Sequence, residues 1–192
     1  MPGTSVIVDV EAACCEDNSF PRQEMEIIEI GAVAVASHTG KVHLEFQSFV
    51  RPVRHPILFD FCREFTRIGQ LEVDAAEGYP KTLIRFGGLL ADLGFYDFCS
   101  WVFDDRNQFE QDSGVHAVAY PFAGPHRNLK LEFSEVAGSR KKFGVGGALR
   151  KQGLRFEGTP HRGIDDARTI ARIYAAVLAS GGADRPGLGE TP

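Results

Sequence analysis

The chain has 192 residues, of which 43% are hydrophobic and 24% charged, a composition that fits one globular domain and excludes a fibre or a disordered chain. The 26 acidic residues outnumber the 21 basic ones, which argues against broad, non-specific binding of duplex DNA. No apolar run approaches the roughly 20 residues that span a bilayer. Because the first residues also lack the features of a signal peptide, we expect a soluble cytoplasmic protein.

Three segments rich in β-branched residues predict strands near the amino terminus, over residues 5–10, 25–37 and 41–51. The second and third are separated by the turn signal at residues 38–40, and the third alternates apolar with polar side chains. These two segments are therefore expected to pair as a hairpin, so that the domain opens with an antiparallel meander.

Beyond residue 56 the apolar residues adopt a helical spacing. They recur every three or four positions between Leu83 and Leu93, which predicts a helix. Residues 97–103 predict a buried strand, and the polar stretch 105–112 predicts the start of another helix. The spacing of apolar residues from Ile170 to Leu178 predicts an amphipathic helix with two aspartates in its first turn.

This order of elements predicts an α/β fold in which helices cover a mixed sheet. We expect one domain over residues 1–179 and a disordered tail over residues 180–192, which are rich in Gly and Pro. None of the four cysteines forms a CxxC pair, so reduced thiols are expected rather than a zinc site.

Asp9 and Glu11 stand at the end of the first predicted strand, where a side-chain period of two places both on one face. Two acids on one face of a core strand repel each other, and burying them requires a compensating cation, either a basic side chain or a metal ion. The alternative is a solvated strand end at which both acids are exposed. These two residues alone do not decide between the alternatives.

Two further acids strengthen the case for a metal. Asp105 follows an apolar segment at the point where a strand gives way to a helix, although Asp104 beside it competes for the role. Asp166 lies in the first turn of the last helix, five residues after His161. Taken singly, an aspartate there more often caps the helix, so the argument rests on the set of acids together.

Carboxylates without a Cys or His cluster suit Mg²⁺ or Mn²⁺. A pair of such ions roughly 3.5–4 Å apart can stabilise both the attacking and the leaving oxygen of a phosphodiester. His161, on a short link to Asp166, is the candidate for taking a proton from the attacking water.

Five segments together resemble the DEDDh 3′-5′ exonucleases, with the greatest similarity to the Eri/KapD-like branch of the DnaQ-like group. They are VDVEAAC at 8–14, EIIEIGAV at 26–33, FCREFTRIGQLEVDAA at 61–76, SWVFDDRNQFEQD at 100–112 and GTPHRGIDDARTIARI at 158–173. The resemblance implies a ribonuclease H-like fold with a mixed five-stranded sheet flanked by helices.

The resemblance also implies roles for individual residues. The catalytic set is Asp9, Glu11, Asp105, His161 and Asp166. In this set Asp9, Glu11 and Asp166 hold two Mg²⁺ ions, for which Mn²⁺ is the alternative. Asp105 acts partly through water, and His161 is the general base.

Other positions in the matching segments are expected near the terminal nucleotide, each with core packing as its alternative role. They are Cys14, Phe61, Thr66 and Trp101. The chain departs from the family pattern at Arg67, Val102 and Asp104. Arg67 is expected to reshape the pocket for the 3′ end, and the other two to alter the sheet edge beside Asp105.

Residues 139–162 contain seven basic residues, the last of which is Arg162, and the single acid Glu157. This segment is expected either to line the approach for a phosphate backbone or to form a solvated face.

Together with this segment, the resemblance predicts a metal-dependent 3′-5′ exonuclease that acts on single-stranded 3′ ends, of RNA in preference to DNA, and releases nucleoside 5′-monophosphates. The alternatives are a proofreading DNA exonuclease and a non-catalytic RNA- or ribosome-binding adaptor.

Overall fold

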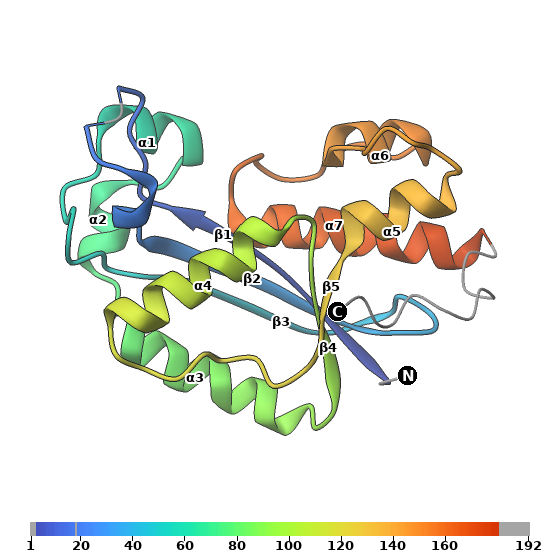
Figure 1. Cartoon of the computed structure of the whole chain (residues 1–192), viewed down its shortest axis with the longest axis horizontal. Coiled ribbons are helices and arrows are strands. Elements are labelled where there is room, and N and C mark those ends of the chain that lie inside the picture. Colours follow the sequence, from blue (N-terminus) through green and yellow to red (C-terminus); the bar gives the residue numbers. More distant parts are fainter. Residues whose placement is uncertain (1–2, 18, 181–192) are drawn as a thin grey trace.

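Five strands form one mixed sheet in the computed structural model, which describes residues 3–17 and 19–180. Their order across the sheet is β3-β2-β1-β4-β5 (Figure 1). β2 runs antiparallel to β1 and β3, whereas β4 runs parallel to β1 and β5. The predicted hairpin and the mixed five-stranded sheet are confirmed. The strands are β1 (Thr4–Ala12), β2 (Ile27–Ala36), β3 (Val42–Phe49), β4 (Tyr96–Ser100) and β5 (His126–Asn128).

Helices cover both faces of the sheet (Figure 1). Side chains of α3 and α4 form one core with the sheet, and those of α5, α6 and α7 form a second core on the opposite face. Helices α1 and α2 enclose a third, smaller core beside the end of β1. The helices are α1 (Asp60–Thr66), α2 (Gln70–Asp74), α3 (Tyr79–Asp92), α4 (Phe103–Val115), α5 (Leu129–Val136), α6 (Val145–Lys151) and α7 (Gly163–Ala179), and a 3₁₀ turn spans Arg22–Glu24.

The alternation of side chains along β1 decides which face carries its acids. Val6 and Val8 pack in the core formed with α3 and α4, whereas Ile7 packs in the core formed with α7. Because successive strand residues point to opposite faces, Asp9 and Glu11 continue the row of Ile7. Both carboxylates therefore stand on the α7 side of the central strand, as the period of two predicts.

One predicted boundary is wrong. The strand expected over residues 97–103 ends at Ser100, and Phe103 already begins α4. The apolar residues beyond Ser100 resemble a strand because Trp101 is buried in the core with α7, where its Nε1 donates a hydrogen bond to the Phe143 carbonyl. Asp104 and Asp105 occupy the first turn of α4, where acidic side chains favour a helix.

The last predicted helix is present as α7, which ends at Ala179. Residues 181–192 of the predicted tail lie outside the described residues. Within residues 3–17 and 19–180, none of the helices combines the length and the apolar character that crossing a bilayer requires.

Candidate active site

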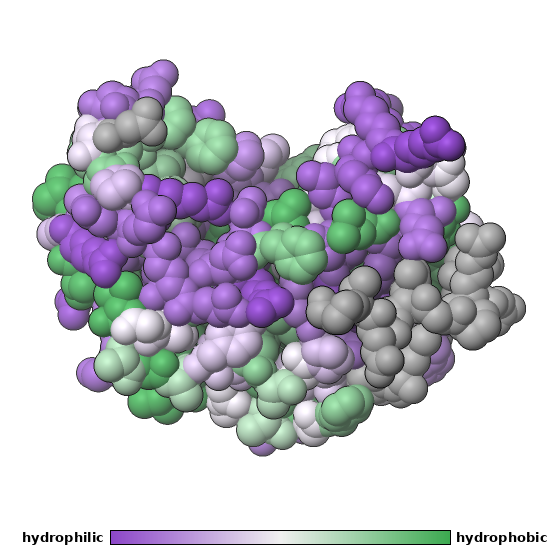
Figure 2. Space-filling model, viewed as in Figure 1, coloured by the Kyte–Doolittle hydropathy of each residue, from purple (hydrophilic) through white to green (hydrophobic). Residues whose placement is uncertain are grey.

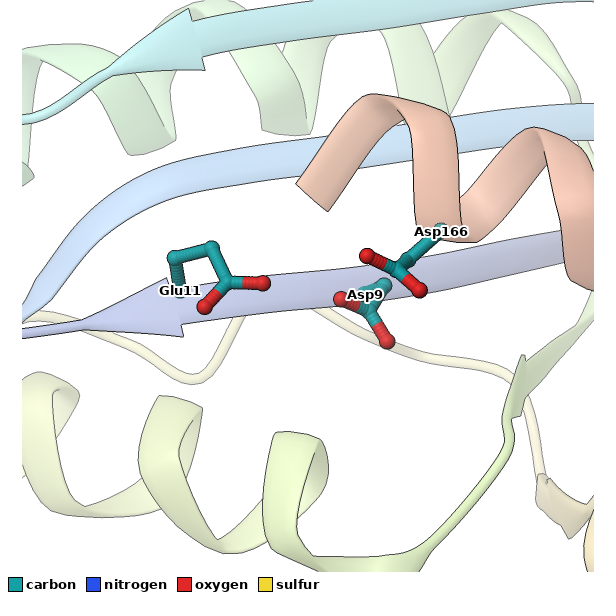
Figure 3. A group of neighbouring side chains, drawn as sticks. All are labelled: Asp9, Glu11 and Asp166. Carbon is teal, nitrogen blue, oxygen red and sulfur yellow. The ribbon is translucent and has the colours of Figure 1, made fainter. Parts of the chain in front are cut away.

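Three carboxylates that are distant in sequence meet where β1 passes the start of α7. Asp9 and Glu11 project from β1, and Asp166 projects toward them from the first turn of α7 (Figure 3). One oxygen from each lies within 4.8 Å of the other two. The Glu11 residue is only 8% exposed, and Asp9 and Asp166 are half-buried, so these acids do not stand at a fully solvated strand end.

Two glycines let α7 begin directly against the sheet. A Cβ atom on Gly31 in β2 would lie 2.1 Å from the backbone carbon of Gly163, and a Cβ on Gly163 would lie 2.9 Å from the Asp9 carbonyl oxygen. Gly31 is also paired with Asp9 in the sheet register. Because no side chain separates the backbones, the first turn of α7 is held against the strand that carries Asp9.

A fourth acid, Glu29 in β2, holds the start of α7 through hydrogen bonds. Its fully buried carboxylate accepts hydrogen bonds from Arg162 Nε (3.0 Å), the Gly163 amide (3.1 Å) and Gln47 Nε2 (3.0 Å). Arg162 was expected in the free basic segment, but its guanidinium is committed to this ion pair and lies over the Phe49 ring. The sequence signal for Glu29 is an acid inside the otherwise apolar segment EIIEIGAV.

Burial and mutual repulsion disfavour the charged forms of the clustered acids. Burial, followed by the nearby Asp166 and Glu29, raises the pKa of Glu11 to about 8. Burial and the neighbouring Asp105 raise the pKa of Asp9 well above its usual range, and burial also raises the pKa of Asp166. Since an adjacent cation would stabilise all three charges, the cluster is electrostatically incomplete as protein alone.

Both adjacent aspartates at the start of α4 line the cleft, but only Asp105 of the two is buried. Asp105 is 6% exposed, and its Oδ1 accepts a hydrogen bond from the Val10 amide at 3.2 Å. Its Oδ2 is buried without a hydrogen-bond partner in the described part of the chain, and burial raises its pKa to about 7. Asp104 is instead exposed and forms an ion pair with Arg22.

The adjacent aspartates at the start of α7 divide in the same way. Asp166 joins the carboxylate cluster, and its Oδ2 accepts a hydrogen bond from the His161 amide at 2.7 Å. Asp165 accepts from the Thr159 amide and forms an ion pair with Arg168. Asp165 therefore stabilises the loop before α7 and the start of the helix, whereas the carboxylate of Asp166 belongs to the cluster.

His161 precedes α7 on an exposed loop with a left-handed backbone, φ 62°. Its imidazole is stacked on the Phe65 ring of α1, with the ring centroids 3.9 Å apart and an interplanar angle of 27°. The sequence analysis did not predict a role for Phe65. It lies one helical turn after Phe61, which was expected near the terminal nucleotide.

A cleft of about 340 Å³ lies beside the cluster, lined by residues that include Glu11, Cys14, Phe65 and Asp105. Of the positions expected near a nucleotide, only Cys14 lines it. The Thr66 hydroxyl is fully buried and bonds to the Cys62 carbonyl and the Ile68 amide. Trp101 is buried in the core formed with α5, α6 and α7, and Phe61 stacks on Phe65. These three residues are not part of the cleft wall.

The donor set suits a hard divalent cation. Asp9, Glu11 and Asp166 present carboxylate oxygens within reach of a single ion, and oxygen is the ligand that Mg²⁺ and Mn²⁺ prefer. The unpartnered Oδ2 of Asp105 adds a buried acceptor beside them. These carboxylates are therefore the residues that would hold a divalent metal ion.

Comparison with known proteins identifies the family of this chain. The human protein named 3′-5′ exoribonuclease 1 is 34% identical over 185 residues, which cover 91% of this chain and 52% of the human protein. The Bacillus subtilis (strain 168) protein named probable 3′-5′ exonuclease KapD is 32% identical over 166 residues, covering 83% of this chain and 75% of that protein. The chain thus spans about half the length of the human relative.

The fold has a solved counterpart. The nuclease domain of 3′hExo, described as a DEDDh family member bound to rAMP, superposes with a TM-score of 0.87 at 30% identity, covering 95% of each chain. Residues 6–174 of this chain match the family model described as Exonuclease (RNase_T). The chain therefore belongs to the Exonuclease (RNase_T) family and has its ribonuclease H-like fold.

Proposed function

We propose that this chain is a divalent-metal-dependent 3′-5′ exonuclease. It removes nucleoside 5′-monophosphates from single-stranded 3′ ends, of RNA in preference to DNA. The observation that carries the proposal is the meeting of Asp9, Glu11 and Asp166 beside a cleft, without a basic partner for any of them in the described chain. The names of the human and Bacillus subtilis relatives, and the rAMP in the 3′hExo structure, support this reaction class.

In this proposal Asp9, Glu11 and Asp166 hold two Mg²⁺ ions, with Mn²⁺ as the alternative. When bound, such ions supply Lewis acid chemistry that stabilises negative charge on the phosphate and on the attacking and leaving oxygens. The protein contributes a rigid site, because β1 is the central strand and α7 begins against it.

His161 is the proposed general base, which accepts the proton of the attacking water. Its exposed loop brings the imidazole to the edge of the cluster, where its own amide bonds to Asp166, and imidazole is the side chain most often used for proton transfer. Asp105 contributes its unpartnered Oδ2 as an acceptor that orients a water molecule near the cluster.

The preference for a single strand rests on where free positive charge remains. Six basic residues between 140 and 155 are exposed and form no side-chain hydrogen bond or ion pair within the described chain, whereas arginines such as Arg85, Arg127 and Arg168 are paired with acids. Figure 2 shows hydrophilic side chains over α6, across a hollow from α1. A few local charges suit a short stretch of backbone. The six are Arg140, Lys141, Lys142, Arg150, Lys151 and Arg155.

The test is digestion of 5′-labelled RNA and DNA oligomers of one sequence, with Mg²⁺, with Mn²⁺ or with chelator. We expect a ladder that shortens from the 3′ end, faster on RNA, and its complete loss in chelator. Replacing Arg150 and Lys151 by glutamate should raise KM for long oligomers more than for dinucleotides, and reduce the salt dependence of binding. No product with either metal would overturn the proposal.

The same assay separates the alternatives. Faster digestion of DNA would favour the proofreading type of exonuclease, since discrimination depends on contacts to the 2′-OH that no residue here establishes. The unpaired basic residues favour the adaptor as a second candidate, and RNA binding that persists in chelator without any product would support it. The cytoplasmic location expected from the sequence remains a prediction.

A further inference from the structure

The His161 ring stacks on one aromatic side chain. The backbone of His161 is fixed, because its amide donates to Asp166 and its φ angle is 62°. The imidazole itself forms no hydrogen bond or ion pair with any described residue. The ring stacks on Phe65, with the centroids 3.9 Å apart.

Phe65 is well placed to control this ring. It belongs to α1, and it lines the same cleft as Glu11 and Asp105. Phe65 also stacks on Phe61, whose ring lies nearly parallel at 11° with a centroid distance of 5.6 Å. Phe61, Phe65 and His161 thus form a row of three rings that links α1 to the start of α7.

Phe65 is 43% exposed, so its ring lies at the surface and is not enclosed in a core. A second ring stacked on an aromatic side chain contributes enough to bias one orientation over another by roughly 2- to 12-fold. General bases are ordinarily oriented by a hydrogen bond to the second ring nitrogen. Here an aromatic face occupies that role, because no acceptor among the described residues contacts the imidazole.

We infer that Phe65 is a positioning residue for His161. By stacking on the imidazole it restricts the ring to orientations at the edge of the carboxylate cluster, and so increases the fraction of molecules whose base is ready to accept a proton. The inference rests on the proposed exonuclease function for its catalytic consequence. The stacked ring pair itself can be tested without substrate or metal.

The first experiment observes the imidazole directly. In the full-length, metal-free protein labelled with ¹³C-histidine, the His161 ring protons should resonate upfield because they lie against an aromatic face, and H161Q identifies their signals. Phe65→Ala should move these signals downfield toward the position of an exposed histidine, while Phe65→Tyr keeps them upfield. The matched control is Phe95→Ala, which removes an equally large ring that is 71% exposed between α3 and β4 and should leave all six histidines unchanged.

The second experiment asks whether Phe65 acts through His161. Phe65→Ala should lower kcat on an RNA oligomer about three- to tenfold, and Phe65→Tyr should restore it. In a His161→Ala background the same substitution should have no further effect on kcat, because the ring that it positions is absent.

The outcomes are separable. Unchanged His161 signals in Phe65→Ala, with the other histidine signals still dispersed as in the folded wild type, would overturn the stacking. An equal loss of kcat in both backgrounds would also overturn the inference, and would indicate that Phe65 contacts the substrate independently. A wild-type protein that digests no oligomer would refute the proposed function, while the spectra would still decide whether Phe65 orients the imidazole.

Discussion

Buried carboxylates fall into two groups that differ in how their charge is compensated. Away from the cleft, Glu26 is 2% exposed, and its oxygens accept hydrogen bonds from the Val53 and Arg54 amides. Asp112 is 1% exposed and accepts from the Ile27 amide at 2.7 Å and from Gln108 Nε2 at 3.0 Å. Glu29 has an arginine and an amide. Each of these acids is supplied with donors by the fold.

The acids of the cleft are treated differently. Asp9 and Glu11 accept no hydrogen bond from any described residue, and Asp105 leaves one oxygen unpartnered. Glu29 receives donors from β3 and from the start of α7. Glu11, directly opposite in the register, receives none from the described residues. Because an uncompensated buried charge costs several kcal/mol, this contrast supports the proposal that Asp9 and Glu11 hold a cation rather than serve the scaffold.

The sharpest test of the contrast uses the adjacent pair in α7. Asp166→Asn should reduce exonuclease kcat by at least about 1,000-fold, which corresponds to roughly 4 kcal/mol of lost transition-state stabilisation. Asp165→Asn removes the same charge one residue away, where it serves Thr159 and Arg168, and should cost less than about threefold. Equal losses in a steady-state assay would show that the cluster is not the reacting site.

Metal binding should increase the stability of the folded protein. At saturating Mg²⁺, about 100 times the dissociation constant, binding adds about 2.7 kcal/mol to the free energy of unfolding. This should raise Tm by about 5–10 °C for a chain of this size. Asp9→Asn should abolish the Mg²⁺ effect yet raise Tm in chelator, because a neutral amide avoids the cost of burying a carboxyl group beside Glu11 and Asp166. Calorimetry that finds no Mg²⁺ effect in the wild type would contradict the contrast.

Among the acids that the fold supplies with donors, Asp112 can be tested through the pH dependence of the free energy of unfolding. Burial raises its pKa from 3.8 to about 6, so the folded state holds the proton more tightly than the unfolded state. Its contribution to stability is therefore full below about pH 4 and is lost as the pH rises to about 6, a change of about 3 kcal/mol. Asp112→Asn should flatten the urea unfolding free energy between pH 4 and 6. An unchanged slope would show that another group dominates that range.

Much of the fold follows from local patterns. β-branched segments and the turn at residues 38–40 predict the hairpin, and the spacing from Ile170 to Leu178 predicts α7. The short helices α1, α2, α5 and α6 carry too few apolar repeats to be recognised, and β5 is only three residues long. Their positions depend on tertiary packing, which no local pattern records.

The candidate site also contains some features that local patterns predict and others that only tertiary packing creates. The meeting of Asp9 and Glu11 on one face follows from the strand period alone, and the resemblance places Asp166 with them. The contacts between Glu29 and Arg162, and between Phe65 and His161, join residues about 130 and 96 positions apart, so only the folded chain brings them together. Thr66 and Trp101, expected near the nucleotide, have buried partners of their own.

The close approach of Gly31 to the first turn of α7 has a consequence for mutational screens. Any side chain at position 31 would displace the backbone of Gly163, from which a Cβ would lie 2.1 Å away, and would move Asp166 with it. In a library of all single substitutions selected for activity, Gly31 should therefore tolerate as few replacements as the acids themselves. A residue without any functional group would then score as catalytic, and only its distance from the reacting atoms would reveal that it acts by leaving space.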